Sequence, residues 1–377
     1  MYRSGSISLL PQFLMAIILN RSWLMLILLL HQHDCGVSGK PQVPCIFIFG
    51  DSLSDSGNNN QLLTSSKANY IPYGIDFPSG PTGRFTNGRT AADFITQRLG
   101  FENLIPPFAN ISASDILKGV NYASGASGIR NDTGSHLGAK ISLGLQIANH
   151  RAIASQIASR LGGDGKGRQY LKKCLYYVNI GSNDYLQNYF LPQCFPTSSI
   201  YNPEQFSEAL IQEYSQHLRA LYELGSRKFA LFGLFLLGCV PNELTNHGDG
   251  SLLCVKEENR AVLMFNDKLR GLVDQLNEEF SDAKFIYVNS ALISSKSPLL
   301  DGVDICLRSI GKSGCCQVRA DGMCDPNKSP CAERSLKMFF DSFHPTEAAN
   351  HFLATLAYKS LFPIFAYPMD ISHLVRL

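Results

Sequence analysis

The sequence has no strong excess of charge of either sign. Its 33 Lys and Arg residues face 31 Asp and Glu, which gives a formal net charge of +2, and the basic residues are scattered along the chain. A basic patch or run is the usual electrostatic signature of a nucleic-acid-binding protein. The composition therefore argues against nucleic acid as a partner and favours an uncharged or weakly charged substrate.

The chain also lacks an uninterrupted apolar run of the roughly 20 residues that a membrane-spanning helix needs. Near the N-terminus, Arg3 precedes two shorter apolar runs, at residues 13–19 and 23–30, with small residues following at 36–39. This pattern is typical of a secretory signal peptide. We predict a signal over residues 1–39, a secreted, extracellular (apoplastic) protein and no stable membrane insertion; an uncleaved anchor is the less favoured alternative.

Two motifs that mark common folds are missing. Neither G-x-G-x-x-G nor a Walker lysine accompanies the Gly-rich stretch at residues 124–128, which argues against a nucleotide-binding loop. No G-x-S-x-G occurs anywhere in the chain, which disfavours an ordinary α/β-hydrolase. We expect no cofactor and no metal.

Cysteine, in contrast, is plentiful, with 11 residues in the chain. In a secreted protein we expect disulfides that hold loops together. The last four C-terminal cysteines also suit a zinc site, but they lack repeated C-x-x-C spacing, so disulfides are favoured and their connectivity stays open. We expect Cys45 and Cys174, at the edges of apolar strands, to be buried free thiols. The eight cysteines in loop-like C-terminal sequence are Cys194, Cys239, Cys254, Cys306, Cys315, Cys316, Cys324 and Cys331.

Three Asn-x-Ser/Thr sequons also agree with secretion. They begin at Asn110, Asn131 and Asn327. In a secreted chain such sequons predict glycosylated surface loops.

The candidate nucleophile lies in the stretch IFIFGDSLSDSGNNN, residues 46–60. Its apolar, β-favouring run ends at Gly50 and leads into a polar turn that carries Asp51 and Ser52. A strand that ends in such a turn presents Ser52 at the edge of a sheet. Because Gly-Asp-Ser also occurs in ordinary turns, the motif alone is a modest signal.

Strand and helix patterns then alternate along the chain, which favours parallel βαβ units. Two further strands end in Gly and small polar residues, at 124–128 and 181–184, so their turns are expected to meet the Ser52 turn at one edge of the sheet. We predict an α/β fold with a five-stranded sheet, in a single domain over residues 40–377 with a Cys-rich insertion near 301–333. The later strands are expected at 119–123, 174–180, 229–237 and 285–288, and the main helices at 89–99, 143–161, 203–224 and 257–280.

The last informative stretch is FFDSFHPTEAANHF, residues 339–352. Asp341 and His344 lie three residues apart, directly before Pro345, which suits the entry to a helix that continues to about residue 361. Such an entry loop can hold both side chains toward one point. On its own the stretch also fits an Asp341 helix cap with His344 on the surface.

Taken together, these stretches resemble the plant-type GDSL esterase/lipase family of the SGNH hydrolase superfamily. The resemblance covers nearly the whole chain after residue 40 and follows the family's motif order. It implies a three-layer α/β/α sandwich of flavodoxin-like type with a mostly parallel central sheet. The motifs that carry it are FIFGDSLSDSGNNN, PYGIDFPSGPTGRFTNGRTAADF, GVNYASGASGI, VNIGSNDY, GCVP and FFDSFHPTEAAN.

The resemblance also implies a role for five positions. Ser52 matches the nucleophile, His344 the base and Asp341 the acid of a catalytic triad. The oxyanion hole would use the backbone of Ser52, the backbone of Gly125 and the amide of Asn183. The chain departs from the pattern at Ala126 and at Gln317, where relatives carry glycine.

The implied activity is hydrolysis of carboxylic esters, of a lipid or of an acylated metabolite or polysaccharide. A transacylase that uses the same acyl-enzyme is the nearest alternative, and a secreted binding protein without activity is the alternative from another class. The natural substrate and the oligomeric state cannot be predicted from these residues.

Overall fold

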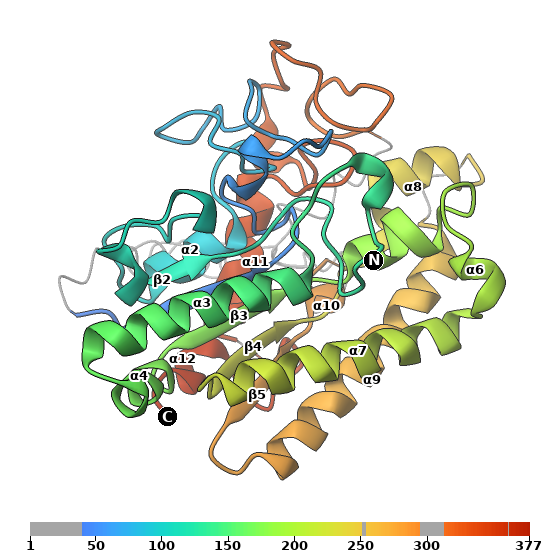
Figure 1. Ribbon diagram of the computed structural model, residues 1–377. Helices are drawn as coiled ribbons and strands as arrows, with labels where there is room; N and C mark the ends of the chain where they lie inside the picture. Colours follow the sequence, from blue (N-terminus) through green and yellow to red (C-terminus); the bar gives the residue numbers. More distant parts are fainter. Residues whose placement is uncertain (1–39, 251–253, 295–312, 361) are drawn as a thin grey trace, which may run out of the picture. The chain divides into compact units, whose positions relative to one another are not determined.

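A central sheet organises the computed structural model, which describes residues 40–250, 254–294, 313–360 and 362–377 (Figure 1). The predicted signal peptide, and residues 301–312 of the predicted insertion, lie outside the described residues. Pro41–Leu377 form one compact unit. None of the helices in the described part of the chain is long and apolar enough to cross a membrane.

Six strands build this sheet, in the order β2-β1-β3-β4-β5-β6. The first five pair in parallel, as predicted, and β6 pairs antiparallel with β5. The prediction of five strands missed β6, which is only two residues long and carries no sequence periodicity. The strands are β1 (Ile46–Gly50), β2 (Gly119–Asn121), β3 (Leu175–Asn179), β4 (Lys228–Phe232), β5 (Lys284–Val288) and β6 (Ala366–Tyr367).

Helices cover both faces of the sheet, which confirms the α/β/α architecture (Figure 1). On one face lie α3 (Leu143–Leu161), α7 (Pro203–Glu223) and α9 (Lys256–Glu279), and α7 packs along α9. On the other face α2 (Ala91–Arg98) packs against α11 (Glu347–Tyr358). The shorter helices are α4 (Asp164–Leu171), α5 (Ser182–Asp184), α6 (Thr197–Ile200), α8 (Pro241–Asn246), α10 (Ser290–Ser294) and α12 (Ile371–Leu374). Short 3₁₀ turns occupy Asn58–Gln61, Phe108–Asn110, Asp115–Leu117, Ser135–Leu137, Leu237–Cys239 and Arg334–Leu336, and a π-turn occupies Tyr185–Tyr189.

Local capping chemistry sets where the longer helices begin. Thr90 and Asp93 form a capping box that starts α2 two residues after the predicted Arg89. Asn202 and Gln205 do the same for α7, with Pro203 at its first position, as predicted. These reciprocal bonds satisfy backbone N–H groups that a helix start otherwise leaves unpaired.

The strand order places a topological switch beside β1. The connection from β1 leads to β2 on one side of the sheet, and the connection from β3 leads to β4 on the other side. In open α/β sheets, ligands bind outside the carboxyl ends of the strands at such a switch point. Gly50 at the end of β1 pairs with Asn179 at the end of β3. A Cβ on Gly50 would lie 2.5 Å from the Asn179 carbonyl oxygen, so only glycine allows this close approach.

The predicted fourth strand is too long. It ends at Phe232 instead of Leu237. Beyond it, Asn266 of α9 takes over the backbone hydrogen bonds, accepting from Leu234 N–H at 2.7 Å and donating to its carbonyl at 2.8 Å. The segment that follows therefore leaves the sheet and turns toward the carboxyl edge.

Four disulfides connect the described cysteines, and they correct one prediction. Cys45 and Cys174 are bonded to each other, instead of being free thiols. The reason is register: each precedes its strand, and Ile46 and Leu175 pair directly. Cys194 is exposed and has no disulfide partner among the described residues, while Cys306 lies outside them. The remaining disulfides, Cys239–Cys254, Cys315–Cys331 and Cys316–Cys324, hold loops together as expected.

His150 on α3 makes the stability of the protein sensitive to acid. Its ring is fully buried among aromatic rings, including those of Phe47 and Tyr176, and burial lowers its pKa from the ordinary 6.5 to about 3. The unfolded chain binds a proton here below pH 6.5, whereas the folded protein does not until the pH nears 3. The stabilising contribution of neutral His150 is therefore present above pH 6.5 and lost as the pH falls.

We predict that a His150→Phe variant removes this acid sensitivity. Between about pH 6 and about pH 4, the unfolding free energy of the wild type should fall relative to that of the variant by about 1.4 kcal/mol per pH unit. Urea unfolding over a pH series measures the difference. Tyr122→Phe is the control, because it removes the Tyr122–His150 hydrogen bond and keeps the histidine. Parallel pH curves for the wild type and His150→Phe would contradict the prediction.

Candidate active site

Ser52 stands at the start of the turn that follows β1. The Asp51 carbonyl accepts hydrogen bonds from the N–H groups of Ser54 and Asp55 at 3.1 and 3.0 Å, which curl the chain directly after the strand. The Ser52 side chain projects from this curl at the carboxyl edge of the sheet. Its backbone N–H donates to no described residue, so it is available to a ligand.

The polar residues after Ser52 tie its turn to the loop after β2. Asp55 accepts from the N–H groups of Gly57, Asn58 and Gly125, at 2.7, 2.8 and 3.0 Å. Asn58 and Asn59 add side-chain bonds to the carbonyls of the same second loop. The long motif at residues 51–60 therefore fixes one catalytic turn against another.

His344 connects Ser52 to Asp341. Its Nε2 lies 2.8 Å from Ser52 Oγ, and its Nδ1 lies 2.7 Å from Asp341 Oδ2. When Nδ1–H donates to Asp341, Nε2 is left as the acceptor for the serine hydroxyl. Ser52 and Asp341 thus each lie within hydrogen-bond distance of His344, although Ser52 and His344 are 292 positions apart in the chain.

The Asp341 carboxylate is fully buried and every hydrogen-bonding direction around it is used. Oδ1 accepts from the N–H groups of Phe343 and His344, at 2.8 and 2.7 Å. Oδ2 accepts from His344 and from the hydroxyl of Tyr73, at 2.6 Å for the latter. Asp341 therefore shapes its own loop and does not cap α11, where Thr346 takes that role.

Tyr73 is a site residue that the sequence did not single out. It is fully buried, and its hydroxyl also accepts from the N–H of Cys324, at 3.0 Å, in the loop closed by the Cys316–Cys324 disulfide. It links the disulfide-bonded loop to the triad carboxylate. The available signal is the dense run of aromatics, Gly and Pro at residues 69–93, which does not indicate a contact for this residue.

Asn183 lies in α5, directly after β3. One hydrogen of its side-chain amide donates to the Ser127 carbonyl at 2.9 Å, which orients the group and leaves the second hydrogen unused by that bond. Asn183 borders the same cavity as Ser52 and His344. The amide of Asn183 is therefore held beside the cavity that Ser52 and His344 also line.

Gly125 and Ala126 differ in their surroundings. The Gly125 N–H already donates to Asp55, and a Cβ at this position would come within 2.7 Å of Phe85, Asn59 and Ser66. Ala126 has a left-handed φ of 64°, its N–H donates to no described residue, and it borders the cavity. For alanine this conformation costs about 1–2 kcal/mol relative to the right-handed one, a local strain at the position where relatives carry glycine.

Asp51 places a second carboxyl group next to Ser52. It is buried, Oδ1 accepts from Leu53 N–H at 2.9 Å, and Oδ2 has no hydrogen-bond partner among the described residues. Burial raises the pKa of Asp51 to about 7. The charge beside Ser52 therefore changes near neutral pH.

A cavity of about 240 Å³ opens above these groups. Besides Ser52, Ala126, Asn183 and His344, its wall is divided about evenly between apolar and polar side chains. The apolar wall comes from Leu53, Leu137, Leu186, Leu191, Phe235, Met323 and Phe343, and the polar residues include Asp51, His136, Gln187, Asn242, Asn246 and Asp321.

A buried serine that is hydrogen-bonded to a histidine, which is itself oriented by a carboxylate, defines the class of serine hydrolases. The comparison with known families is more specific. The chain belongs to the family of GDSL-like lipases and acylhydrolases, which it matches over residues 46–357, and it is a carboxylic ester hydrolase.

Individual relatives agree with this assignment. The chain is 47% identical to one GDSL esterase/lipase of Arabidopsis thaliana, over 89% of this chain and 92% of the relative. Two others from the same organism are 44% and 45% identical, each over 90% of this chain and 94% of the relative. The family match includes β1 to β5 and the residues Ser52, Asn183, Asp341 and His344.

Proposed function

We propose that the protein hydrolyses esters through an acyl-enzyme on Ser52, with His344 as general base and acid and Asp341 as the residue that orients it. The observation that supports this most strongly is the His344 ring, which lies 2.8 Å from Ser52 Oγ on one side and 2.7 Å from Asp341 on the other. A serine hydroxyl is a weak nucleophile at neutral pH and needs a base at this distance.

The reaction then has two halves. Ser52 Oγ attacks the ester carbonyl carbon while His344 Nε2 takes its proton, and the alcohol leaves with that proton as the ester C–O bond breaks. Water next attacks the acyl-enzyme and gives a proton to His344. The bond from Ser52 to the acyl carbon breaks, the proton returns to Ser52 Oγ, and the carboxylic acid is released.

The tetrahedral intermediate needs hydrogen-bond donors for its oxyanion. We propose the Ser52 N–H, the Asn183 amide and the Ala126 N–H for this role. The resemblance pointed to Gly125, whose N–H is occupied by Asp55, whereas the neighbouring Ala126 N–H is free of described partners and borders the cavity. Gly125 serves packing under this proposal, because its missing Cβ lets Phe85 and Asn59 approach.

Replacing Asn183 by alanine tests the oxyanion hole. We predict that Asn183→Ala lowers kcat by about a hundredfold to a thousandfold with a small change in KM, because the lost donor acts mainly in the transition state. Steady-state kinetics on a p-nitrophenyl ester measure both constants. Gln187→Ala, which changes another amide bordering the cavity, should stay within a few-fold of the wild type. Unchanged kcat in Asn183→Ala would exclude the residue as a donor.

The apolar part of the cavity wall supports an ester with an apolar acyl group. A second, smaller cavity of about 60 Å³ is almost entirely apolar and shares Leu53 and Phe235 with the first. Beyond the end of β4 at Phe232, Leu234 and Leu237 are buried, whereas Phe235 borders both cavities. Release of p-nitrophenol from esters of increasing acyl length would test this. Activity with medium chains is expected, and activity confined to acetate would oppose an apolar acyl site.

A transacylase remains the second candidate, since a hydroxylated acceptor that outcompetes water would use the same acyl-enzyme. Product analysis with an added alcohol separates the two: free acid supports the hydrolase, and a new ester supports the transacylase. A binding protein without activity would not require Ser52, His344 and Asp341 to be hydrogen-bonded in this order, so this alternative is disfavoured.

Secretion, through a signal at residues 1–39, is part of the proposal. Four disulfides link described cysteines, and such bonds persist in oxidising compartments. Asn110, Asn131 and Asn327 are all exposed, as glycosylated sequons must be. Mass spectrometry of the secreted protein, before and after removal of N-glycans, would show the mature N-terminus and the occupied sites.

A further inference from the structure

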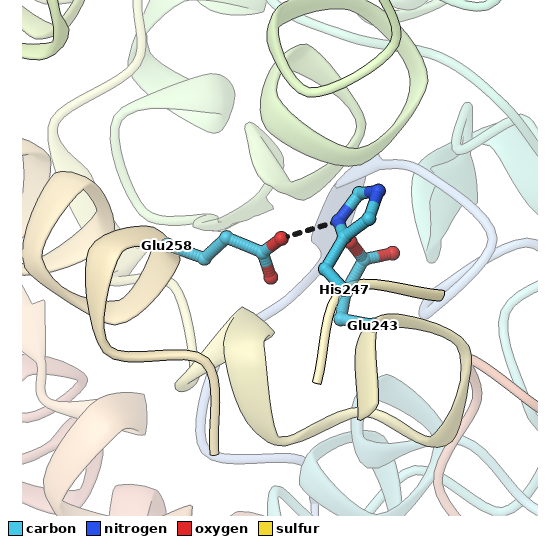
Figure 2. A group of neighbouring side chains, drawn as sticks. All are labelled: Glu243, His247 and Glu258. Atoms are coloured by element: carbon cyan, nitrogen blue, oxygen red, sulfur yellow. Dashed lines mark hydrogen bonds and ion pairs between the residues drawn. The ribbon is translucent and has the colours of Figure 1, made fainter. Parts of the chain in front are cut away.

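A second cluster of chemically active side chains lies at the α8–α9 corner, outside the triad. Glu243 and His247 are four residues apart, the first within α8 and the second at its C-terminal end, and Glu258 comes from the first turn of α9 (Figure 2). Their three ligand-type atoms all lie within 4.8 Å of one another. Figure 2 shows the Glu258 carboxylate reaching from α9 toward the ring of His247, which stands beside Glu243.

The cluster carries more negative charge than its own residues balance. His247 Nδ1 lies 2.6 Å from Glu258 Oε1 and 2.9 Å from Glu243 Oε2. A single Nδ1–H can donate well to only one of them. Two carboxylates therefore share at most one positive charge, and no other ion pair to either is found among the described residues.

Both carboxylates are removed from water. Only 3% of the Glu243 side chain and 5% of the Glu258 side chain are exposed, whereas 43% of His247 is. Glu258 Oε2 has no hydrogen-bond partner in the described part of the chain, and the contact of Glu243 Oε2 is with His247 Nδ1, whose other contact is the closer Glu258 Oε1. Burial, and then the charge of Glu243, raise the pKa of Glu258 to about 8. Buried, unpartnered carboxylate oxygens normally coordinate a metal or pair with a cation.

We propose that Glu243, His247 and Glu258 bind a divalent transition-metal cation, with zinc as the best match. Two carboxylates and an imidazole are a donor set that zinc accepts, whereas the hard cations calcium and magnesium prefer oxygen alone. Two ionised carboxylates and a neutral imidazole also cancel the charge of a divalent ion. His247 would bind through Nδ1, and water would complete the tetrahedron.

The distances require only a small rearrangement. Ligand atoms that surround a tetrahedral zinc at about 2.0–2.1 Å are separated from one another by about 3.3 Å. The two contacts of His247 Nδ1, at 2.6 and 2.9 Å, would therefore open by less than about 1 Å on binding. The exposed ring of His247 lies at the surface and can make this movement without disturbing the core.

A metal bound at this site would stabilise the wall of the cavity that Ser52 borders. Asn242 and Asn246 of α8 border that cavity, and the Asn242 side chain donates to Glu243 Oε1 at 2.7 Å. The Cys239–Cys254 disulfide holds the residues just before α8 and α9 together. The metal would add a second link beyond this bond, between α8 and the first turn of α9.

Zinc binding to the purified full-length chain tests the proposal. The protein should carry no polyhistidine tag, keep its disulfides, and be freed of metal with a chelator. We expect one zinc per chain by elemental analysis, a higher melting temperature with zinc, and visible absorption bands of a four-coordinate site when cobalt(II) replaces it. Glu258→Gln and His247→Gln should each weaken zinc binding by at least about a hundredfold, since they remove a direct ligand.

Glu257→Gln is the matched control, because it removes an exposed carboxylate from the neighbouring position of α9. It should bind zinc like the wild type. Failure of the wild type to take up zinc at micromolar concentrations would overturn the proposal and leave a protonated His247 as the bridge between the carboxylates. Equal binding by the wild type and Glu258→Gln would overturn it as well, by placing the metal elsewhere. These readouts do not depend on esterase activity.

Discussion

Ser52→Ala is expected to lower kcat for ester hydrolysis by about a millionfold, to the level that binding and the oxyanion hole provide alone. The change removes only the hydroxyl that lies 2.8 Å from His344 Nε2. No other hydroxyl is expected to replace it as the acyl acceptor. Because the fold of the turn depends on backbone bonds and on Asp55, the variant should fold normally.

Kinetics with a p-nitrophenyl ester, together with circular dichroism, would measure this effect. Ser56→Ala is the matched control, since it removes another buried hydroxyl of the same loop, one with no hydrogen-bond partner in the described part of the chain. It should keep nearly full activity. Comparable activity in Ser52→Ala and the wild type would remove Ser52 as the nucleophile.

Asp341→Asn is expected to lower kcat by about ten-thousandfold while leaving the fold intact. Oδ1 accepts from two backbone N–H groups, so the new amide should place its oxygen there and its NH₂ group toward His344. An NH₂ group cannot accept from Nδ1–H. His344 would then carry its proton on Nε2, facing Ser52, and could no longer accept the proton of the hydroxyl.

A control variant and the tautomer of His344 make this prediction specific. Asp321→Asn changes an exposed carboxylate that borders the same cavity, and its activity should stay within a few-fold of the wild type. NMR of the ring nitrogens should find the His344 proton on Nδ1 in the wild type and on Nε2 in Asp341→Asn. A fully active Asp341→Asn variant would show that the carboxylate does not set the tautomer.

The fold was largely predictable because its strands are short and apolar and alternate with helices. The first five strands were all located, and the errors have local physical causes. β4 was extended through apolar residues whose backbone bonds to Asn266, a contact between segments 32 positions apart. The two-residue β6 has too few residues to show a pattern. The Cys45–Cys174 disulfide depends on strand register, which sequence alone does not reveal.

Ser52, Asp341 and His344 could be singled out for a different reason: they lie within long, specific motifs. The contacts that hold these three residues in place could not be predicted in this way. Tyr73 donates to Asp341 across 268 positions, and nothing in its own neighbourhood marks this contact. The conformation of Ala126 and the occupation of the Gly125 N–H by Asp55 likewise emerge only once the two turns are packed together. Sequence motifs thus singled out the residues proposed to react, and packing determined which groups hold them in place.

The most direct test of the proposed mechanism is to treat the protein with a fluorophosphonate probe and locate the adduct by peptide mass spectrometry. The mechanism predicts one adduct per chain, on Ser52, with labelling much slower in Asp341→Asn and absent in Ser52→Ala. An adduct on another residue, or no adduct on a folded protein with its disulfides formed, would contradict the assignment of Ser52 as the nucleophile.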